Sequence, residues 1–314
     1  MGRKRKDETM TWQEITDEAY ERIKDMVGNE KRFKEWMMSR EKVGYTFDAV
    51  LIGKCYQIWQ HLQKKNDYVV VIVGREGSGK STLSFQISSW IDPTFTVDRV
   101  HIDPSSFIRS LKNSKAGQAQ SLDEGGLALF SRETMSEGNK NLVKIFMTIR
   151  MKSLLLTINI PDFGSLDAYV RRHRVHLLIE VLKRGDYKAY FGEAINKVNR
   201  DLPKTRSLAG IKLPIPYFWH GSFNDGTGLV DDDAYDVKKL AHVNSFLDSM
   251  DKELKERDVK PQYISVKEFA RMLGVHHDTV RTWQYEGKLK TIKAGKRVLI
   301  PLTIAQKIMK EGIK

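Results

Sequence analysis

Residues 74–81 place glycines, a lysine and a serine at a spacing that suits the binding of a triphosphate. They read Gly-Arg-Glu-Gly-Ser-Gly-Lys-Ser, the pattern GxxxxGK followed by Ser or Thr. Glycines let backbone N–H groups approach phosphate oxygens, Lys80 would reach the β- and γ-phosphates, and Ser81 would ligate Mg²⁺. We therefore predict ATP and Mg²⁺ as cofactors, with a chance glycine-rich turn as the alternative. The predicted nucleotide-binding residues are Gly74, Arg75, Glu76, Gly77, Ser78, Gly79, Lys80, Ser81 and Thr82.

Two adjacent carboxylates, Asp123 and Glu124, end a short strand that is predicted to begin at Ala119. Asp123 can hold Mg²⁺ through water, and Glu124 can polarise the attacking water as a general base. Gln120 and Ser121 interrupt the apolar run expected of such a strand. A surface Asp-Glu pair before a glycine turn is therefore the alternative to a catalytic pair.

Further polar positions are candidates for the catalytic site. Asn159 ends another predicted strand and can sense the γ-phosphate or position the water, unless it only caps the turn before Pro161. Arg171 and Arg172 precede the next strand, and one of them can be an arginine finger that enters a neighbouring subunit's site. Arg150 is a second finger candidate. For the arginine pair, a solvated basic edge or a DNA contact fits as well.

Short apolar runs alternate with amphipathic stretches from residue 67 to about 192. This alternation predicts an α/β fold with a mainly parallel sheet flanked by helices. The β-branched run 68–73 predicts a buried strand before the glycine loop, and 82–90 predicts a helix after it, which is the order that a P-loop NTPase requires. The other predicted elements are strands at 98–102, 154–159, 175–181 and 187–191, and a helix at 105–111.

We predict four parts along the chain. Residues 1–66 form a helical N-terminal extension, because Ile15, Ala19, Ile23 and Met26 recur at helical spacing. Residues 67–192 form the ATPase core. Residues 193–260 are a linker with prolines, a turn cluster at 221–228 and a helix at about 231–256. Residues 261–314 form a small basic module.

The basic module reads as a winged helix-turn-helix. Ser265 is a candidate N-cap, with Glu268 three positions later as in a capping box, and the first helix ends at Gly274. A second short helix follows, with Val280 and Trp283 facing the core. The segment 287–301 then predicts a basic hairpin, or wing.

The net charge of +13 favours nucleic acid, anionic lipid or an acidic partner without deciding between them. The basic run at residues 3–6 can be an arm on a phosphate backbone or a solvated tail. No apolar stretch approaches the roughly 20 residues of a membrane helix, and the N-terminus has no apolar signal core. Cys55 stands alone, which excludes an intrachain disulfide. We expect a cytoplasmic protein, or one in the host cytoplasm if the source is viral.

The P-loop, the strand ending in Asp123-Glu124 and the later strand ending in Asn159 resemble the additional-strand, catalytic-glutamate division of P-loop ATPases. Over residues 67–192 the chain is similar to the HerA/FtsK group of DNA-pumping ATPases, which includes packaging and conjugative motors and Zot-like phage proteins. Members often carry Gln where this chain has Asn159. The resemblance implies a homo-oligomer, possibly a hexameric ring, and a capsid or secretion-channel partner.

Residues 265–301 resemble the MerR/excisionase type of winged helix-turn-helix, which implies binding of double-stranded DNA. The recognition helix would enter the major groove, and the wing would hold backbone phosphates. The groove residues would be His276, His277, Thr279, Arg281 and Thr282, and the phosphate contacts would be Lys288, Lys290, Lys293, Lys296 and Arg297. A winged helix that contacts protein is the alternative.

Three functions remain open at this point. The first is an ATP-driven motor on double-stranded DNA, whose C-terminal module selects or anchors the viral, plasmid or mobile-element substrate. The second is a DNA-bound switch, such as a regulator, replication initiator or partition protein, controlled by ATP without translocation. The third is a small-molecule kinase, against which Glu124 next to Asp123 argues, because that pair favours water as the acceptor.

Overall fold

The computed structural model describes residues 10–123, 144–205, 208, 211, 218–224, 229–258, 263–295 and 297–313. The chain divides into two compact units, Met1–His242 and Val243–Lys314, and each is described by itself. The four-part division predicted from the sequence, with boundaries near residues 66, 192 and 260, stays a prediction.

The first unit is built on a sheet that has seven strands in the described part of the chain, in the order β2-β3-β4-β1-β5-β6-β7. The five strands from β2 to β5 are parallel, while β6 and β7 are antiparallel to their neighbours. The mainly parallel α/β fold is thereby confirmed. The strands are β1 Tyr68–Gly74, β2 Val100–His101, β3 Ala119–Leu122, β4 Leu155–Ile160, β5 Leu177–Lys183, β6 Asp186–Phe191 and β7 Phe218–Ser222.

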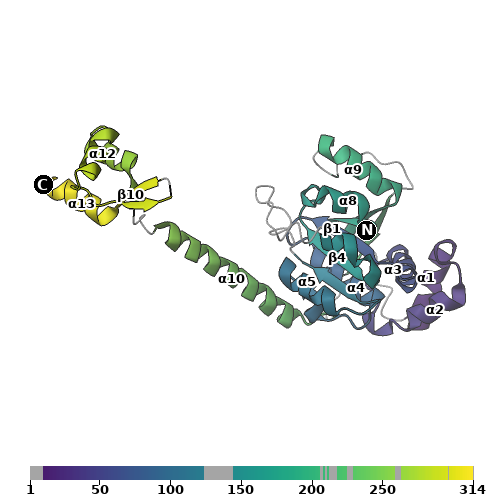
Figure 1. The fold of residues 1–314 in the computed structure, drawn as a ribbon. Coiled ribbons are helices and arrows are strands. Elements are labelled where there is room, and N and C mark those ends of the chain that lie inside the picture. Colours follow the sequence, from purple (N-terminus) through teal and green to yellow (C-terminus); the bar gives the residue numbers. More distant parts are fainter. Residues whose placement is uncertain are drawn as a thin grey trace. The chain divides into compact units, whose positions relative to one another are not determined.

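Alternating side chains of β1 enter two separate cores, because successive side chains of a strand point to opposite faces of its sheet. Val70 and Ile72 belong to the core shared with α1 to α4, whereas Val69 and Val71 belong to the core shared with α5, α8 and α9. Helices therefore cover both faces, as a buried parallel sheet requires (Figure 1). These helices are α1 Trp12–Val27, α2 Glu30–Met38, α3 Ala49–Gln63, α4 Lys80–Ile91, α5 Pro104–Asn113, α8 Ala168–His173 and α9 Glu193–Thr205.

The N-terminal helices pack onto the same core as α4. Figure 1 shows α1, α2 and α3 grouped together beside the rest of the first unit. The Trp36 and Trp90 rings lie 5.6 Å apart, and the guanidinium of Arg40 lies over Trp36 and donates from Nε to the carbonyl of Trp90 at 3.0 Å. Cys55 of α3 is fully buried. The predicted helical character of this segment is confirmed.

The polar residues of β3, which made this strand doubtful in the sequence, are buried and hydrogen-bonded. Gln120 binds His101 of β2 at 2.8 Å and Ser110 of α5 at 2.8 Å. Ser121 lies 3.0 Å from the hydroxyl of Ser84 in α4. These bonds remove the cost of burying polar groups, so an interrupted apolar run still forms a central strand.

The last strand of the sheet, β7, corrects one expectation. Residues 221 and 222 were predicted to begin a turn cluster, but Gly221 and Ser222 lie in β7 and pair with β6. A Cβ atom on Gly221 would lie 2.1 Å from the hydroxyl of Tyr187. That hydroxyl donates to Asp48 at 2.6 Å, and Asp48 also caps α3 and accepts from the backbone N–H of Ser222. Only glycine fits this junction. Residues 225–228 of the predicted cluster lie outside the described residues.

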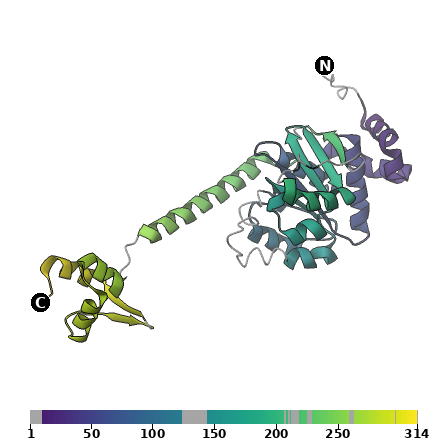
Figure 2. The same cartoon turned by 90° about the horizontal axis from the view of Figure 1, so that it is seen from above.

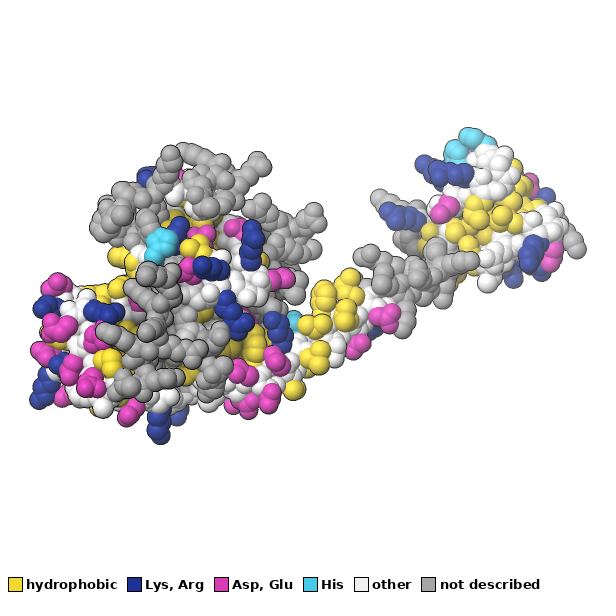
Figure 3. All heavy atoms as spheres, turned by 180° about the vertical axis from the view of Figure 1, so that it is seen from behind, with side chains coloured by type: hydrophobic (Ala, Val, Ile, Leu, Met, Phe, Trp, Pro, Cys, Tyr) yellow, Lys and Arg dark blue, Asp and Glu magenta, His cyan; other side chains and the backbone are white. Residues whose placement is uncertain are grey.

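The helix predicted at about residues 231–256 is α10, Asp232–Asp258. It begins in the first unit and continues into the second. Several of its apolar side chains are exposed, among them Val237 at 68% and Leu240 at 61% (Figure 3). No helix in the described ranges is both long enough and apolar enough to cross a membrane.

The second unit contains the predicted helix-turn-helix and wing. Ser265 caps α11, Val266–Leu273, by accepting from the N–H of Glu268 at 3.2 Å, and Gly274 ends that helix with φ +68°. The core of this unit includes buried Phe269 and Val280, with Trp283 packed against it. Figure 2 shows the β9–β10 hairpin extending from the helices. The remaining elements are α12 His277–Tyr285, α13 Leu302–Glu311, β8 Tyr263–Ser265, β9 Ile292–Ala294 and β10 Arg297–Pro301.

Candidate nucleotide site and DNA-binding module

The glycine loop joins the end of β1 to the start of α4, as the sequence predicted. Gly74 has φ +151°, and a Cβ atom there would lie 2.6 Å from the carbonyl oxygen of Val181 on β5. Gly79 precedes α4 with φ +97°. Side chains are disfavoured at both positions, which keeps the backbone N–H groups of the loop accessible at the N-terminus of α4. Such a helix N-terminus attracts phosphate through its N–H groups and its dipole.

The ammonium group of Lys80 lies against the loop itself. Its Nζ donates to the carbonyl oxygens of Gly74 and Arg75, each at 2.9 Å. The cation is therefore held over the loop that would receive a phosphate, and it can exchange these carbonyls for phosphate oxygens. Ser78 is buried, and its Oγ has no hydrogen-bond partner in the part of the chain that the structure describes. A buried hydroxyl without a partner is uncommon, and a bound ligand can satisfy it.

Asp123 lies at the centre of the site and is 1% exposed. Both of its carboxylate oxygens lie 3.0 Å from the hydroxyl of Ser81, the first serine of α4. Asn159 at the end of β4 donates from Nδ2 to Oδ1 at 2.7 Å. The hydroxyl of Tyr235, in the first turn of α10, donates to Oδ2. Side chains from three elements, α4, β4 and α10, thus converge on one carboxylate at the carboxyl ends of β1, β3 and β4.

The donor set fits Mg²⁺. Hard oxygen ligands are the ones that this ion prefers, and two oxygens that share an octahedral Mg²⁺ lie about 2.9 Å apart. The Ser81 hydroxyl and the Asp123 carboxylate are 3.0 Å apart, next to the loop that would hold the phosphates. Ser81 and Asp123 could therefore hold the ion together, directly or through water.

Asn159 lies where the sequence placed it, but its side chain does not cap the turn before Pro161. The amide is fully buried, and its Nδ2 donates to Asp123. Its Oδ1 has no hydrogen-bond partner among the described residues. An unsatisfied acceptor beside the carboxylate can accept a hydrogen bond from a water molecule, which is the property that positioning an attacking water requires.

The candidate arginine fingers lie elsewhere. Arg171 donates from Nε to the carbonyl of Leu166 at 2.9 Å, and Arg172 is exposed next to it. Their helix, α8, leads into the amino end of β5, the edge of the sheet opposite to the P-loop. Arg150 precedes the amino end of β4 and is exposed. The structure therefore does not bring these arginines to the P-loop of their own chain. Glu124, the predicted general base, lies outside the described residues.

Tyr235 was missed by sequence reasoning. It follows Asp123 by 112 positions and lies in a segment that was expected to be a linker. A lone tyrosine in a largely polar helix carries no motif. Its position one turn after Asp231, which caps α10 by accepting from the N–H of Ala234 at 2.9 Å, was the only available signal.

The predicted DNA-contacting side chains lie on the surface of the second unit. His276 caps α12, Arg281 projects from that helix, and Arg297 lies on the wing strand β10. Arg281 lies 3.5 Å from Asp278, which also approaches both histidines. The side chain of His277 is about one-third exposed. The other described candidates are all exposed: His276, Thr279, Arg281, Thr282, Lys288, Lys290, Lys293 and Arg297. Lys296 lies outside the described residues.

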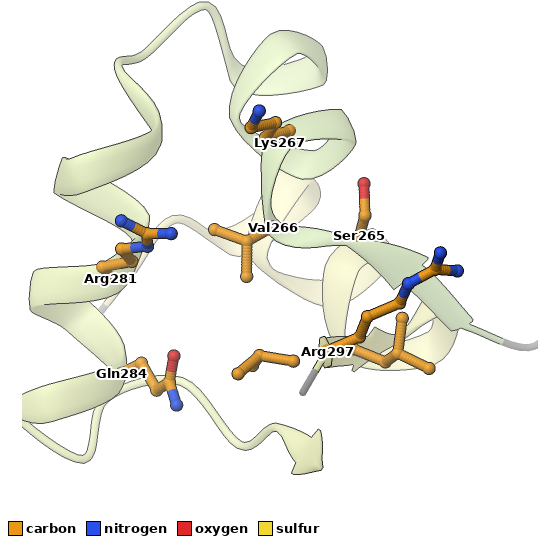
Figure 4. A pocket seen from close by; sticks show the side chains of 8 residues that line it. Ser265, Val266, Lys267, Arg281, Gln284 and Arg297 are labelled. Carbon is orange, nitrogen blue, oxygen red and sulfur yellow. The ribbon is translucent and has the colours of Figure 1, made fainter. Parts of the chain in front are cut away.

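A groove of about 370 Å³ runs between the start of α11, the recognition helix α12 and the wing (Figure 4). Three cations line it, Lys267, Arg281 and Arg297. Ser265 lies there too, at the N-terminus of α11. Cations and a helix N-terminus in one groove suit a backbone phosphate.

Comparisons with known proteins agree with this description of the second unit. Residues 263–303 match the family model of a helix-turn-helix domain. That helix-turn-helix spans β8, α11, α12 and the wing, so the predicted fold of this module is confirmed. The match covers a small part of the chain and leaves the family of the whole chain open.

The comparisons for the whole chain are more distant. No curated protein matches. Among solved structures, the N-terminal domain of zonular occludens toxin from Neisseria meningitidis is 15% identical with a TM-score of 0.31, over 43% of this chain and 91% of that one. A point mutant of RuvB from Thermotoga maritima is 15% identical with a TM-score of 0.30, over 84% of this chain and 95% of that one. TM-scores this low do not decide which family the chain belongs to.

Proposed function

We propose that this chain hydrolyses ATP and uses the energy to move double-stranded DNA, which its helix-turn-helix module recognises. The observation that carries the proposal is that the P-loop serine Ser81 and the amide of Asn159 both lie within hydrogen-bonding distance of the Asp123 carboxylate. Phosphate binding, metal binding and water positioning require these three groups at one place.

Each group has a definite task in hydrolysis. The loop N–H groups and Lys80 bind the β- and γ-phosphates. Ser81 and Asp123 would hold Mg²⁺, which would neutralise charge on the phosphate oxygens when bound. Asn159 accepts a hydrogen bond from the attacking water through Oδ1, and Glu124, which follows Asp123 directly, takes the proton from that water. The other contributions that we expect to lower the barrier to hydrolysis are the positioning of the reactants and the electrostatic stabilisation of the transition state.

The order of strands supports the additional-strand, catalytic-glutamate division of P-loop ATPases. In the first unit β4 lies between β1, which carries the P-loop, and β3, which ends at Asp123. This intervening strand, β4, places the amide of Asn159 within hydrogen-bonding distance of the Asp123 carboxylate. The narrower assignment to DNA-pumping members rests on the resemblance of residues 67–192 and on the presence of a DNA-binding module in the same chain.

A ring of identical subunits would explain where the arginines act. Arg150, Arg171 and Arg172 lie toward the edge of the sheet opposite to the P-loop of their own chain. In a head-to-tail ring, one subunit presents this edge to the P-loop of the next, so that an arginine from one subunit can stabilise the transferred phosphoryl group in its neighbour. Native mass spectrometry with ATP and duplex DNA tests this arrangement, and a hexamer is the expected species.

The function itself is tested by displacement. The protein should displace a triplex-forming strand from a long duplex in the presence of ATP, in proportion to the length of the duplex track. Lys80→Ala serves as the control that binds DNA without turnover. Tight binding of one site, with ATP hydrolysis but no displacement on any track, would exclude a motor.

The contact between Tyr235 and Asp123 favours one second candidate, an ATP-controlled DNA-bound switch. The tyrosine belongs to α10, which begins in the nucleotide-binding unit and ends in the DNA-binding unit. A switch needs such a physical link between its ligand site and its output. Slow turnover, with DNA affinity that depends on the bound nucleotide, would support the switch over the motor.

A further inference from the structure

The metal-site carboxylate has a hydrogen-bond donor that no phosphate-loop motif contains. Oδ1 of Asp123 accepts from Ser81 and Asn159, while Oδ2 accepts from Ser81 and from the hydroxyl of Tyr235. Ser81 follows the glycine loop directly, and Asn159 lies on the neighbouring strand β4. Tyr235 alone comes from outside the sheet and its P-loop helix.

The tyrosine ring is held in place from the side of α4. Its edge meets the ring of Phe85, with the ring centroids 5.2 Å apart and the planes at 80°. Phe85 is 7% exposed and belongs to the main core. The ring of Tyr235 therefore packs without needing its hydroxyl, so the hydroxyl can be removed while the packing remains.

The start of α10 is fixed to the edge of the sheet as well. Val230, just before the helix, is buried in the main core. Lys238, one turn after Tyr235, donates from Nζ to the carbonyl oxygens of Val97 and Val100 beside β2. The position of Tyr235 is thus defined by packing before and after it, as an orienting group requires.

We propose that Tyr235 is a positioning residue for the Mg²⁺ site: its hydroxyl orients the Asp123 carboxylate so that the metal-bound nucleotide can bind. The inference rests on the proposed function and extends it to a residue of α10. A ligand carboxylate that is free to rotate must lose that freedom when the metal binds. Hydrogen bonds from neighbouring groups remove this cost in advance, and their loss typically weakens metal binding 10- to 100-fold.

The orientation is specific. The hydroxyl of Tyr235 donates a hydrogen bond to Oδ2 of Asp123, and the amide of Asn159 donates one to Oδ1. The orientation of the carboxylate is therefore fixed at both of its oxygens. The hydroxyl of Ser81 lies 3.0 Å from both oxygens, where the metal would join them. Without Tyr235, Asn159 is the one of these three partners that would still hold the carboxylate when Ser81 turns its oxygen to the metal.

The test is Tyr235→Phe, measured by calorimetric titration with a non-hydrolysable ATP analogue at a series of Mg²⁺ concentrations. Affinity for the analogue in EDTA is expected to match the wild type, because the loop and Lys80 are intact. The Mg²⁺ concentration that gives the half-maximal gain in affinity is expected to rise about tenfold. Tyr169→Phe on α8 is the matched control, and its midpoint is expected to stay at the wild-type value.

Two results would overturn the inference. One is a midpoint for Tyr235→Phe within twofold of the wild type, which would leave the hydroxyl with a structural role at most. The other is a further shift when Tyr235→Phe is added to Asp123→Asn, because the tyrosine is proposed to act only through that carboxylate. A wild-type protein that binds no analogue with or without Mg²⁺ would instead remove the proposed function, and this inference with it.

Discussion

The carboxylate of Asp123 accepts hydrogen bonds, in the described structure, from side chains 42, 36 and 112 positions away along the chain. The first two partners follow from sequence, since Ser81 completes a phosphate-loop motif and Asn159 ends a strand that must lie beside it. The third does not, because nothing in the residues around Tyr235 shows that α10 returns to the sheet. Sequence motifs identify residues that are close together in the chain, whereas the contact between Tyr235 and Asp123 depends on how a distant helix packs.

At the scale of single residues, Lys80→Ala should weaken nucleotide binding about 30- to 150-fold. The substitution removes a charge-assisted contact worth about 2–3 kcal/mol to the phosphates. Fluorescence titration with a labelled ATP analogue measures the change. Lys183→Ala, at an exposed lysine of β5, is the control and should bind normally. Equal affinity of Lys80→Ala and wild type would contradict the assignment of the loop.

His176 should make the stability of the first unit depend on pH. Burial lowers the pKa of His176 from 6.5 to about 4, and its Nδ1 accepts from the N–H of Val69 at 3.0 Å. The unfolded chain binds the proton more readily, so stability is fully present above about pH 6.5 and is lost as the pH falls toward 4, by up to about 3 kcal/mol.

Urea unfolding at several pH values measures this dependence. His176→Asn keeps an acceptor for the N–H of Val69 but does not titrate. The free energy of unfolding of this variant should therefore fall less steeply between pH 6.5 and 4 than that of the wild type. Parallel pH profiles for the two proteins would assign the effect to other groups.

At the scale of elements, the sequence predicted β1 and β4 because they are short, continuous apolar runs, and it predicted α4 because the glycine-loop motif requires a helix after it. Two strands were harder to predict. β3 carries Gln120 and Ser121, whose burial depends on partners in β2, α4 and α5. β7 contains Gly221, a residue that ordinarily signals a turn. Its glycine is needed for close packing against Tyr187, and only the assembled sheet shows that.

Gly221→Ala should therefore destabilise the first unit by about 3 kcal/mol, a large value for a single methyl group. The added Cβ atom would lie 2.1 Å from the hydroxyl of Tyr187 and 2.3 Å from the carboxylate of Asp48, which caps α3. Thermal and urea unfolding measure the loss. Ser222→Ala, at the next and exposed position, should change stability by less than about 0.5 kcal/mol.

In the second unit, the capped helix, the glycine turn and the presence of a wing were predicted because each has a local signal, although the wing strands begin only at Ile292. Arg281→Ala should weaken binding to duplex DNA about 10- to 100-fold, by removing a cation of the recognition helix from the groove beside the wing. Fluorescence anisotropy with a labelled duplex measures the affinity. Lys310→Ala, on α13, removes the same charge elsewhere and should have a smaller effect. ATP hydrolysis without DNA should be unchanged in both variants.

At the scale of the whole molecule, α10 is, among the described helices and strands, the element that crosses the boundary between the two units. Its start contacts Asp123, the proposed metal ligand, through Tyr235. We therefore expect Mg²⁺ and nucleotide to alter DNA affinity, and DNA to alter nucleotide affinity by the same factor. This link could not be predicted from the sequence, because the motifs of the two modules are local and neither includes Tyr235.

The coupling is measurable as the ratio of duplex dissociation constants with and without a non-hydrolysable ATP analogue and Mg²⁺. This ratio should depart from one by about fivefold or more in the wild type. It should move toward one in Tyr235→Phe at the same Mg²⁺ concentration. The Tyr169→Phe protein should keep the wild-type ratio. The same ratio in all three proteins would mean that any coupling bypasses Tyr235.

The buried thiol of Cys55 offers a probe of the helical layer in which it lies. Cys55 is 0% exposed, burial raises the pKa of its thiol, and no other cysteine occurs in the chain. A thiol-reactive dye should therefore leave the native protein unlabelled and modify it only when α3 separates from its neighbours. The labelling rate would therefore measure the rate at which α3 separates from its neighbours. A cysteine introduced on the surface could also be labelled selectively, without first replacing Cys55.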